Sequence, residues 1–265
     1  MPANMSVDKL QEGLQTRRFG KTVLFSSSVP STNDWAKKLA AMGAAEGTVA
    51  VAETQTAGRG RLEREWISPK GGLYFSVIVR PEFDATEAPK LVFVAGLAVA
   101  DALREEYCLK IETKWPNDVL VNGRKICGIL AEMNTTNQEV NYAVIGVGIN
   151  ANFDIRRVFP PSLKPVTTSI ENEVGSRIKL DNLFRAVMSK LEKMYSLFEQ
   201  QGFAPILAEW KKHAAFLGQK VEVTDQREKI VGLALDVDEE GALILRLENG
   251  KTRRVCVGDV SLRIS

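Results

Sequence analysis

The sequence predicts an α+β fold, in which helices pack on a mixed β-sheet and a small all-β module follows. Consecutive strand-like segments fill residues 111–149, and helical patterns lie before and after them. After Leu217-Gly218 the pattern changes to five short strand-like segments, which is typical of a small barrel. We therefore expect an N-terminal extension (1–21), a large domain (22–216) and a C-terminal module (217–265).

The strands are predicted from short runs of apolar and β-branched residues bounded by turn residues. Asn122-Gly123 joins two of these runs and is a type I′ hairpin signal, which presents Lys125 beside Asp118. The proline-rich residues 154–168 are expected to form a mobile connection. The predicted strands of the large domain are residues 22–27, 48–53, 73–79, 111–115, 119–121, 125–133 and 141–149. Those of the C-terminal module are residues 220–224, 230–236, 242–247, 252–257 and 261–264.

The helices are predicted from apolar periodicity and from capping residues. Residues 87–106 are apolar on nearly all sides of a helix, which implies burial against a sheet. Ser31 or Thr32 can cap an earlier helix, while Asp181 caps and Gly202 ends a later one. The predicted helices are residues 32–42, 87–106, 181–202 and a shorter one with Pro205 near its first turn.

Composition and charge exclude several classes of protein. Apolar residues make up 45% and charged residues 26% of the chain, as in ordinary soluble globular proteins. The longest apolar run, residues 91–100, is about half as long as the ~20 residues that a membrane span needs. Residues 1–15 lack the apolar core of a secretory signal. The net charge of +2 gives no general case for nucleic-acid binding.

The cysteines and the single histidine point away from disulfide, zinc and histidine chemistry. Cys108, Cys127 and Cys256 are widely spaced and lack a Cys-x-x-Cys pair, so we expect reduced thiols and a cytoplasmic location. Cys127 lies in an apolar run and is interpreted as a packing residue. His213 lies near a predicted helix end, where a histidine is more often surface than catalyst.

The most informative segment is Glu53–Arg61, which reads Glu-Thr-Gln-Thr-Ala-Gly-Arg-Gly-Arg. Its glycines let the backbone approach a ligand, and its two arginines supply guanidinium groups, a combination that suits a small anion. It is neither a Walker A loop nor a dinucleotide fingerprint. Alone, the segment also fits a solvated basic turn.

Four further segments accompany this loop in order. They are Ser31-Thr32-Asn33, Lys114-Trp115-Pro116-Asn117-Asp118, Gly123 to Leu130, and Gly146-Val147-Gly148-Ile149-Asn150. Together with the loop they resemble the catalytic domain of biotin protein ligases, and the resemblance extends over roughly residues 22–265. It implies an SH3-like barrel at the C-terminus and the form of the enzyme without an N-terminal DNA-binding domain. It also implies activation of biotin with ATP and Mg²⁺, and transfer to a lysine of a biotin carboxyl carrier protein. A homodimer is plausible by resemblance only.

The resemblance implies a catalytic set of Lys125, Arg59, Arg61 and Asp118. The ammonium of Lys125 would reach the biotin carboxylate and the α-phosphate at once, offsetting their repulsion. The two arginines would contact the carboxylate, the adenylate phosphate and the pyrophosphate. Asp118 would either hold Mg²⁺ or orient the lysines, and the sequence leaves both roles open. We expect Arg64, which lies between Glu63 and Glu65, to form surface ion pairs.

Biotin and ATP would share this loop with residues from other segments. Helix capping alone also explains Ser31, Thr32 and Asn33, and the two roles are compatible. Trp66 and Trp115 are candidates for stacking, against a plain core interpretation of similar weight. The biotin-binding set implied is Ser31, Thr32, Asn33, Gln55, Arg59, Gly60, Arg61 and Lys125. The ATP-binding set implied is Arg61, Trp66, Lys114, Asn117, Asn150 and Arg263.

Three alternative functions are weighed. A lipoate ligase or octanoyl transferase shares the catalytic fold, but its floppy apolar substrate would not need hydrogen bonds from Ser31-Thr32-Asn33. A biotin-dependent repressor would carry a winged helix-turn-helix of about sixty residues, and only about twenty precede the first predicted strand here. A non-catalytic biotin-binding module is disfavoured by the four cationic residues Lys114, Lys125, Arg59 and Arg61.

Overall fold

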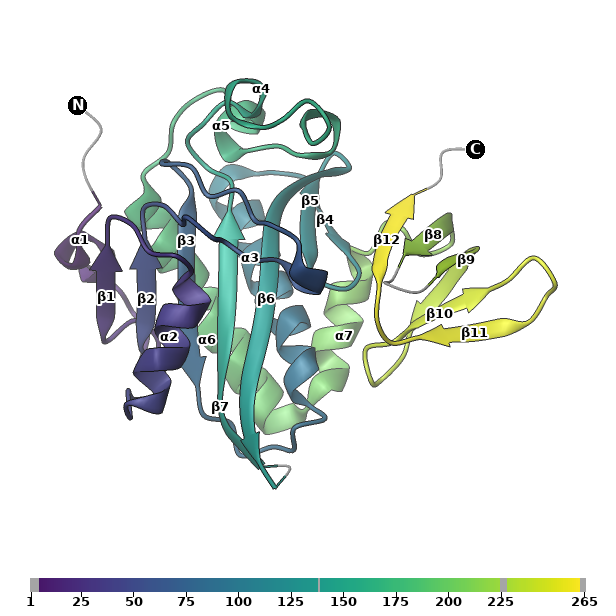
Figure 1. The fold of residues 1–265 in the computed structure, drawn as a ribbon, viewed down its shortest axis with the longest axis horizontal. Helices are drawn as coiled ribbons and strands as arrows, with labels where there is room; N and C mark the ends of the chain where they lie inside the picture. Colours follow the sequence, from purple (N-terminus) through teal and green to yellow (C-terminus); the bar gives the residue numbers. More distant parts are fainter. Residues whose placement is uncertain (1–4, 138, 225–227, 263–265) are drawn as a thin grey trace.

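The computed structural model describes residues 5–137, 139–224 and 228–262 and contains two β-sheets. The first has seven strands in the order β1-β2-β3-β7-β6-β5-β4 (Figure 1). Only β1 and β2 pair in parallel, and each other neighbouring pair is antiparallel. The strands are β1 Val23–Ser26, β2 Val49–Ala52, β3 Leu73–Val79, β4 Ile111–Lys114, β5 Asp118–Val121, β6 Arg124–Thr136 and β7 Glu139–Ile149.

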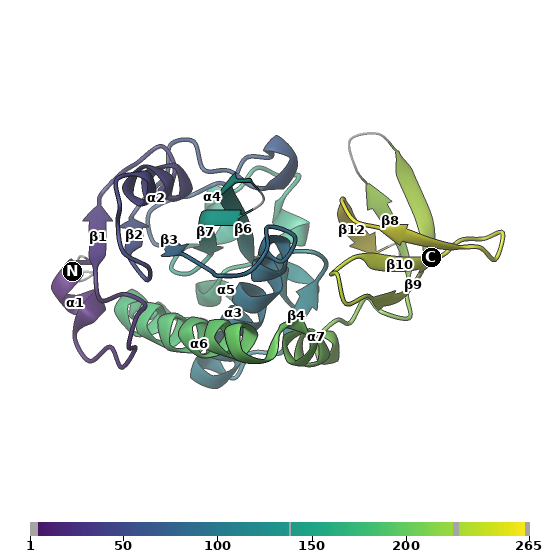
Figure 2. The same ribbon diagram turned by 90° about the horizontal axis from the view of Figure 1, so that it is seen from below.

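Helices cover both faces of this sheet, as the view in Figure 2 makes plain. Helices α3 (Leu91–Tyr107), α6 (Leu180–Gln201) and α7 (Phe203–Lys212) lie on one face and build the main core. On the opposite face, α2 (Thr32–Ala41) packs Ala36 and Ala40 on the sheet. The predicted mixed sheet with packed helices is confirmed.

Residue alternation along β7 explains why one face is a packed core and the other is open. Ile145, Val147 and Ile149 belong to the main core beneath the helices. Gly146 and Gly148 alternate with them and therefore point to the face that carries α2. Because glycines leave no side chains there, other groups can lie directly on the strand.

The C-terminal sheet has five antiparallel strands in the order β11-β10-β9-β8-β12. It lies at the end of the molecule beyond β4 and α7 (Figure 1). Trp115 Nε1 donates to Gly241 O over 2.9 Å, and Lys211 pairs with Asp236 at 2.6 Å, which ties this sheet to the large domain. Its strands are β8 Lys220–Thr224, β9 Lys229–Val237, β10 Leu243–Arg246, β11 Thr252–Val255 and β12 Asp259–Leu262.

One predicted helix cap is wrong, and one connection holds more regular structure than expected. The cap of α6 is Lys179, which makes no side-chain cap bond; Asp181 lies in the first turn and pairs with Arg185 at 3.4 Å. A carboxylate there still complements the helix dipole. Residues 154–168 are more regular than expected, because Asp154 caps a short helix. The elements that the sequence analysis missed are α1 Val7–Gln11, η1 Arg61–Glu63, α4 Ile155–Val158, η3 Lys164–Val166 and α5 Ile170–Val174.

The N-terminal extension packs on the large domain. Leu10 of α1 is fully buried. The backbone N–H groups of Arg17, Arg18 and Phe19 donate to the carboxylate of Glu192 on α6, over 2.6, 2.6 and 2.8 Å. In the part of the chain that the structure describes, no helix is long and apolar enough to cross a membrane.

Candidate active site

A cavity of about 750 Å³ opens on the face of the sheet that carries α2. This volume falls in the range of small-molecule sites. Six regions form its wall: the start of α2, the glycine-arginine loop (residues 53–66), the β4–β5 hairpin with the start of β6, the middle of β6 and β7, residues 159–167, and β12 of the C-terminal sheet. The predicted segments therefore meet in one place, joined by a strand from the second sheet.

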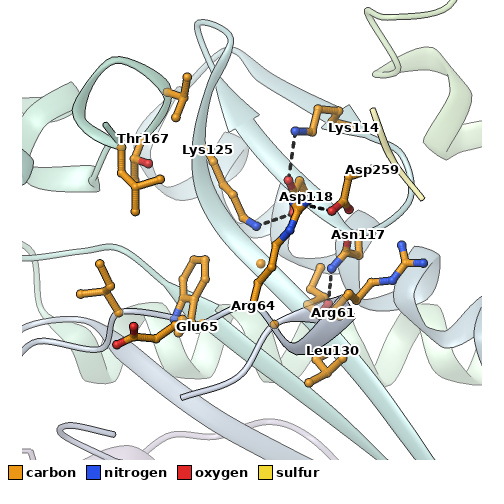
Figure 3. A pocket seen from close by; sticks show the side chains of 18 of the residues that line it. Arg61, Arg64, Glu65, Lys114, Asn117, Asp118, Lys125, Leu130, Thr167 and Asp259 are labelled. Carbon is orange, nitrogen blue, oxygen red and sulfur yellow. Dashed lines mark hydrogen bonds and ion pairs between the residues drawn. The ribbon is translucent and has the colours of Figure 1, made fainter. Parts of the chain in front are cut away.

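Lys114, Asp118 and Lys125 form a compact charged cluster on one wall, which we call the lysine cluster. Lys125 Nζ lies 2.6 Å from Asp118 Oδ1, and Lys114 Nζ lies 3.2 Å from Asp118 Oδ2. Both ammonium groups point at the one carboxylate (Figure 3). The pairing follows from the hairpin: Asn122 and Gly123 both have positive φ, at 50° and 72°, and so turn β5 into β6 as predicted.

The lysines keep Asp118 ionised. Burial alone raises the pKa of its carboxyl, but the charges of Lys125 and Lys114 outweigh it and hold the pKa below its usual range. Each oxygen already faces an ammonium, so a cation would have to displace one of them. Among the described residues, no group of three or more His, Cys, Asp or Glu side chains could hold a metal ion. These contacts support the role of Asp118 in orienting the lysines, and its role as a metal ligand stays a prediction.

Trp66 lies flat on the sheet beside the lysine cluster. A Cβ at Gly148 would come within 2.3 Å of Trp66 Nε1, and one at Gly128 within 3.0 Å of the indole. Lys125 Nζ sits 5.1 Å from the Trp66 ring centroid, within cation–π range. Within the described residues, the buried Trp66 Nε1 has no acceptor. The glycine at 148 thus makes room for the indole of Trp66.

The glycine-arginine loop is a small closed turn. Trp66 N donates to Gly58 O over 2.9 Å and Gly60 N to Arg64 O over 2.7 Å. Gly58 is required, because a Cβ there would lie 2.4 Å from Trp66 O. Arg61 Nη1 reaches Gly258 O at 3.4 Å in the C-terminal module. Burial lowers the pKa of the Arg61 guanidinium, against the opposing charges of Asp259 and Asp118.

The outer arginines of the loop are paired with carboxylates on opposite sides. Arg59 pairs with Asp34 of α2 at 2.5 Å and with Glu132 of β6 at 3.3 Å. Arg64 pairs with Asp259 of β12 (Figure 3). The expected surface ion pair of Arg64 is therefore present, but its partner comes from a separate sheet. These carboxylate partners offset the mutual repulsion of the arginines.

The predicted biotin residues form a buried hydrogen-bond network at the start of α2. Ser31 caps the helix, and its hydroxyl accepts from Asp34 N at 3.4 Å. Gln55 Oε1 accepts from Thr32 N at 2.8 Å. Ser76 Oγ lies 2.6 Å from Asn33 Oδ1 and 2.8 Å from Thr32 Oγ1. Ser76 was missed by sequence reasoning, although a serine inside the apolar strand Leu73–Val79 is a signal that could have found it.

Two comparisons of sequence place the chain. Residues 25–150 match the biotin/lipoate A/B protein ligase family, and residues 216–263 match the biotin protein ligase C-terminal domain. The bifunctional ligase/repressor BirA of Bacillus subtilis is 34% identical over 262 residues, covering 98% of this chain and 80% of that protein. The biotin–[acetyl-CoA-carboxylase] ligase of Paracoccus denitrificans is 35% identical over 225 residues, covering 83% and 92% respectively.

The chain belongs to the biotin protein ligase family. The fold agrees: a biotin protein ligase from Aquifex aeolicus, solved in complex with biotin and ATP, superposes with a TM-score of 0.78. It is 30% identical and covers 92% of this chain and 100% of that one.

The remaining residues predicted to bind ATP or to stack on a ligand lie in different environments. Asn117 lines the cavity, and its Nδ2 donates to Ile129 O over 2.6 Å. Asn150 is fully buried at the end of β7; its Nδ2 donates to Thr168 O over 3.0 Å. Among the described residues, its Oδ1 has no donor. Trp115 is 1% exposed and does not line the cavity, so its core interpretation holds and stacking does not. Arg263 lies outside the described residues.

Of the two residues expected to lie outside catalysis, Cys127 packs in the core as predicted, whereas His213 is more buried than expected. Cys127 is buried, and burial raises the pKa of its thiol well above the usual range, which keeps it unreactive. His213 Nε2 lies 2.8 Å from Arg104 Nη1, behind the sheet among α3 and α7. It does not line the cavity.

Proposed function

We propose that this protein activates biotin with ATP to biotinyl-5'-AMP and transfers the biotinyl group to a lysine of a carrier protein. The observation that carries the proposal is the placement of the lysine cluster and the arginine loop around one cavity, in a member of the biotin protein ligase family. The reaction builds negative charge on phosphate oxygens, so fixed cations should dominate catalysis.

In the first step, a carboxylate oxygen of biotin attacks the α-phosphorus of ATP. The new P–O bond forms as the bond to pyrophosphate breaks, which leaves the mixed anhydride biotinyl-5'-AMP. Lys125 would lie between the two anions and reduce their repulsion, while Asp118 holds its ammonium in place. Arg59 and Arg61 would contact the carboxylate and the phosphates from the loop.

In the second step, a lysine amine of the carrier attacks the biotinyl carbonyl. AMP leaves with the bonding electrons, an amide forms, and the amine gives up its proton. The apolar side chains on the cavity face of the wall, which include Leu130, Phe159 and Leu163, limit water around the anhydride. Ligation therefore needs a cavity that a carrier lysine can enter and that bulk water does not fill.

Two unsatisfied buried atoms support a purine subsite. Asn150 Oδ1 and Trp66 Nε1 are an acceptor and a donor without partners in the described part of the chain. An adenine ring carries both an amino donor and ring-nitrogen acceptors, and its face can stack on an indole. Both residues were predicted for ATP, and we propose that they serve it. Because Asn150 is fully buried, adenine could reach it only if residues 159–168 shift.

A divalent cation such as Mg²⁺ supplies charge neutralisation at the phosphates of ATP and binds mainly phosphate oxygens and water. No side chain of this protein is assigned to it, because both oxygens of Asp118 face lysines.

Substrate choice is the sharpest test of this function. Purified protein with Mg²⁺ and ATP should release pyrophosphate with biotin but not with lipoate or octanoate. The buried polar network of Thr32, Gln55, Asn33 and Ser76 suits a ring that carries N–H and carbonyl groups. Equal turnover with lipoate would favour the lipoate ligase alternative.

The acceptor protein and the cellular location are further parts of the proposal. The carrier would be a biotin carboxyl carrier domain of acetyl-CoA carboxylase or a related carboxylase, as the name of the Paracoccus relative indicates for that protein. We also propose a cytoplasmic location, since Cys108, Cys127 and Cys256 are unpaired. The homodimer and the lack of DNA binding stay predictions, which light scattering and a gel shift at physiological salt would check.

A further inference from the structure

Two carboxylates that do not line the cavity hold an arginine that does. Arg59 Nη2 lies 2.5 Å from Asp34 Oδ1, and 3.4 and 3.3 Å from the two oxygens of Glu132. Arg59 is part of the cavity wall, whereas Asp34 and Glu132 are not. Lys37 braces the pair from outside, with its Nζ 3.0 Å from Asp34 and 2.8 Å from Glu132.

Asp34 and Glu132 contact Arg59 through one nitrogen of its guanidinium. Among the described residues, every hydrogen bond and ion pair of this side chain goes through Nη2. A guanidinium offers five N–H donors in a rigid plane, so the donors on Nη1 and Nε stay available. An arginine fixed at one nitrogen presents the others in a defined direction.

Glu132 also reaches the buried network at the start of α2. Its Oε2 accepts from Asn33 Nδ2 over 2.7 Å, and Asn33 Nδ2 also donates to Leu130 O over 3.2 Å. A Cβ at Gly146 would lie 2.0 Å from Asn33 Oδ1, so this amide is pressed on the sheet. One carboxylate therefore fixes both a loop arginine and a polar group of the cavity wall.

We propose that Glu132 and Asp34 are positioning residues for biotin: they hold Arg59 so that its remaining donors meet the biotin carboxylate. This inference rests on the proposed function. Neither carboxylate touches the substrate. They act by removing the freedom of a long side chain before the substrate arrives, which lowers the entropic cost of binding.

The direction of the change in biotin affinity distinguishes a positioning role of the carboxylates from simple proximity. If the carboxylates were only neighbours, neutralising them would remove negative charge near an anion site and tighten biotin binding. If they position Arg59, neutralising them frees the arginine and weakens binding. The two interpretations therefore predict opposite changes in the dissociation constant.

The test uses Glu132→Gln and Asp34→Asn, with biotin binding measured by calorimetry in the absence of ATP. Each single variant should weaken biotin binding by about threefold to fivefold, the size expected for one partly exposed ion pair. The double variant should lose roughly tenfold if the pairs add. In an Arg59→Ala background, Asp34→Asn should have no further effect, and Glu132→Gln should keep only the smaller loss that passes through Asn33. The KM for ATP should move by less than about twofold.

Glu105→Gln is the matched control, because Glu105 pairs with Lys190 at 2.5 Å between α3 and α6, away from the cavity. It should leave biotin binding unchanged. Unchanged or tighter binding in Glu132→Gln and Asp34→Asn, or equal losses with and without Arg59, would overturn the inference while leaving the proposed function intact. Failure of the unaltered protein to bind biotin would overturn both.

Discussion

The lysine cluster and the glycine-arginine loop line the same cavity but are held by different kinds of structure. Lys114, Asp118 and Lys125 project from paired strands, and the Asp118 side chain is only 10% exposed. Arg59 and Arg64 lie on an irregular loop, and their side chains are 41% and 58% exposed. Side chains on paired strands keep fixed positions, which suits charges that must be preorganised for catalysis. Side chains on a loop can move apart when a ligand enters and return when it is bound.

This difference predicts that the largest loss comes from the lysine cluster. Lys125→Ala should cut pyrophosphate release by about 10²–10³-fold, the usual effect of removing one preorganised donor to a developing anion. Biotin binding should fall far less. Single-turnover pyrophosphate release measures the first quantity and calorimetry the second.

Lys190→Ala is the control for that variant, because Lys190 lies on α6, pairs with Glu105 and does not line the cavity. It should keep normal adenylation. Near-normal adenylation in Lys125→Ala would instead reduce Lys125 to an ordinary partly exposed lysine.

The second prediction concerns the carboxylate that both lysines share. Asp118→Asn leaves two ammonium groups without their common partner, so it should destabilise the protein by about 3 kcal/mol and also slow adenylation. The pKa of Asp118 is held below its usual range, so its stabilising contribution is present at neutral pH. It is lost only as pH falls through that lowered pKa.

Urea unfolding of the two proteins at several pH values checks this prediction. The difference in unfolding free energy should be constant near neutral pH and should shrink below about pH 4. A difference that is already gone at pH 6 would contradict an ionised, lysine-paired Asp118.

Sequence reasoning predicted ion pairs correctly where the two residues of a pair lie close together in the chain. The hairpin at Asn122-Gly123 carries the Lys125–Asp118 pair, so that pair follows from the local pattern. The partner of Arg64, Asp259, is almost two hundred positions away in another sheet. Local patterns contain no information on such a pairing, because it depends on how the two sheets dock. For the same reason, the contacts of Asp34 and Glu132 with Arg59 were not foreseen.

The third prediction tests how the loop is held. Trypsin should cut the free protein first after Arg59 or Arg61, and biotin with Mg²⁺ and ATP should protect the loop more than ATP alone. Arg64→Ala removes the link to Asp259 and should speed cleavage after the remaining arginines by up to about fivefold, as for one exposed ion pair. Gel densitometry over time measures the rate.

Asp259→Asn, which keeps every trypsin site, is the control for that experiment and should speed cleavage similarly. Cleavage at the same rate with and without ligands would show that the loop is a static turn and that the contrast with the strands is mistaken.

The smallest expected effect concerns a titratable group outside the cavity. His213 is the only histidine of the chain, and its Nε2 lies 2.8 Å from Arg104 Nη1 and 3.8 Å from Glu209 Oε1. Burial, reinforced by the charge of Arg104, lowers its pKa below the ordinary value of 6.5. Asp101 and Glu209 oppose this shift, and Lys212 adds to it.

Because the folded protein disfavours the protonated ring, the unfolded chain binds the proton more readily. Stability should therefore fall as the pH drops from 6.5 through the lowered pKa, and His213→Gln should flatten the curve over that interval. The pH profile of pyrophosphate release should be the same in both proteins, since His213 does not line the cavity. A changed profile in the variant would mean that the charge of His213 affects the reaction in the cavity from the far side of the sheet. The rate would then depend on charges outside the lysine cluster and the arginine loop.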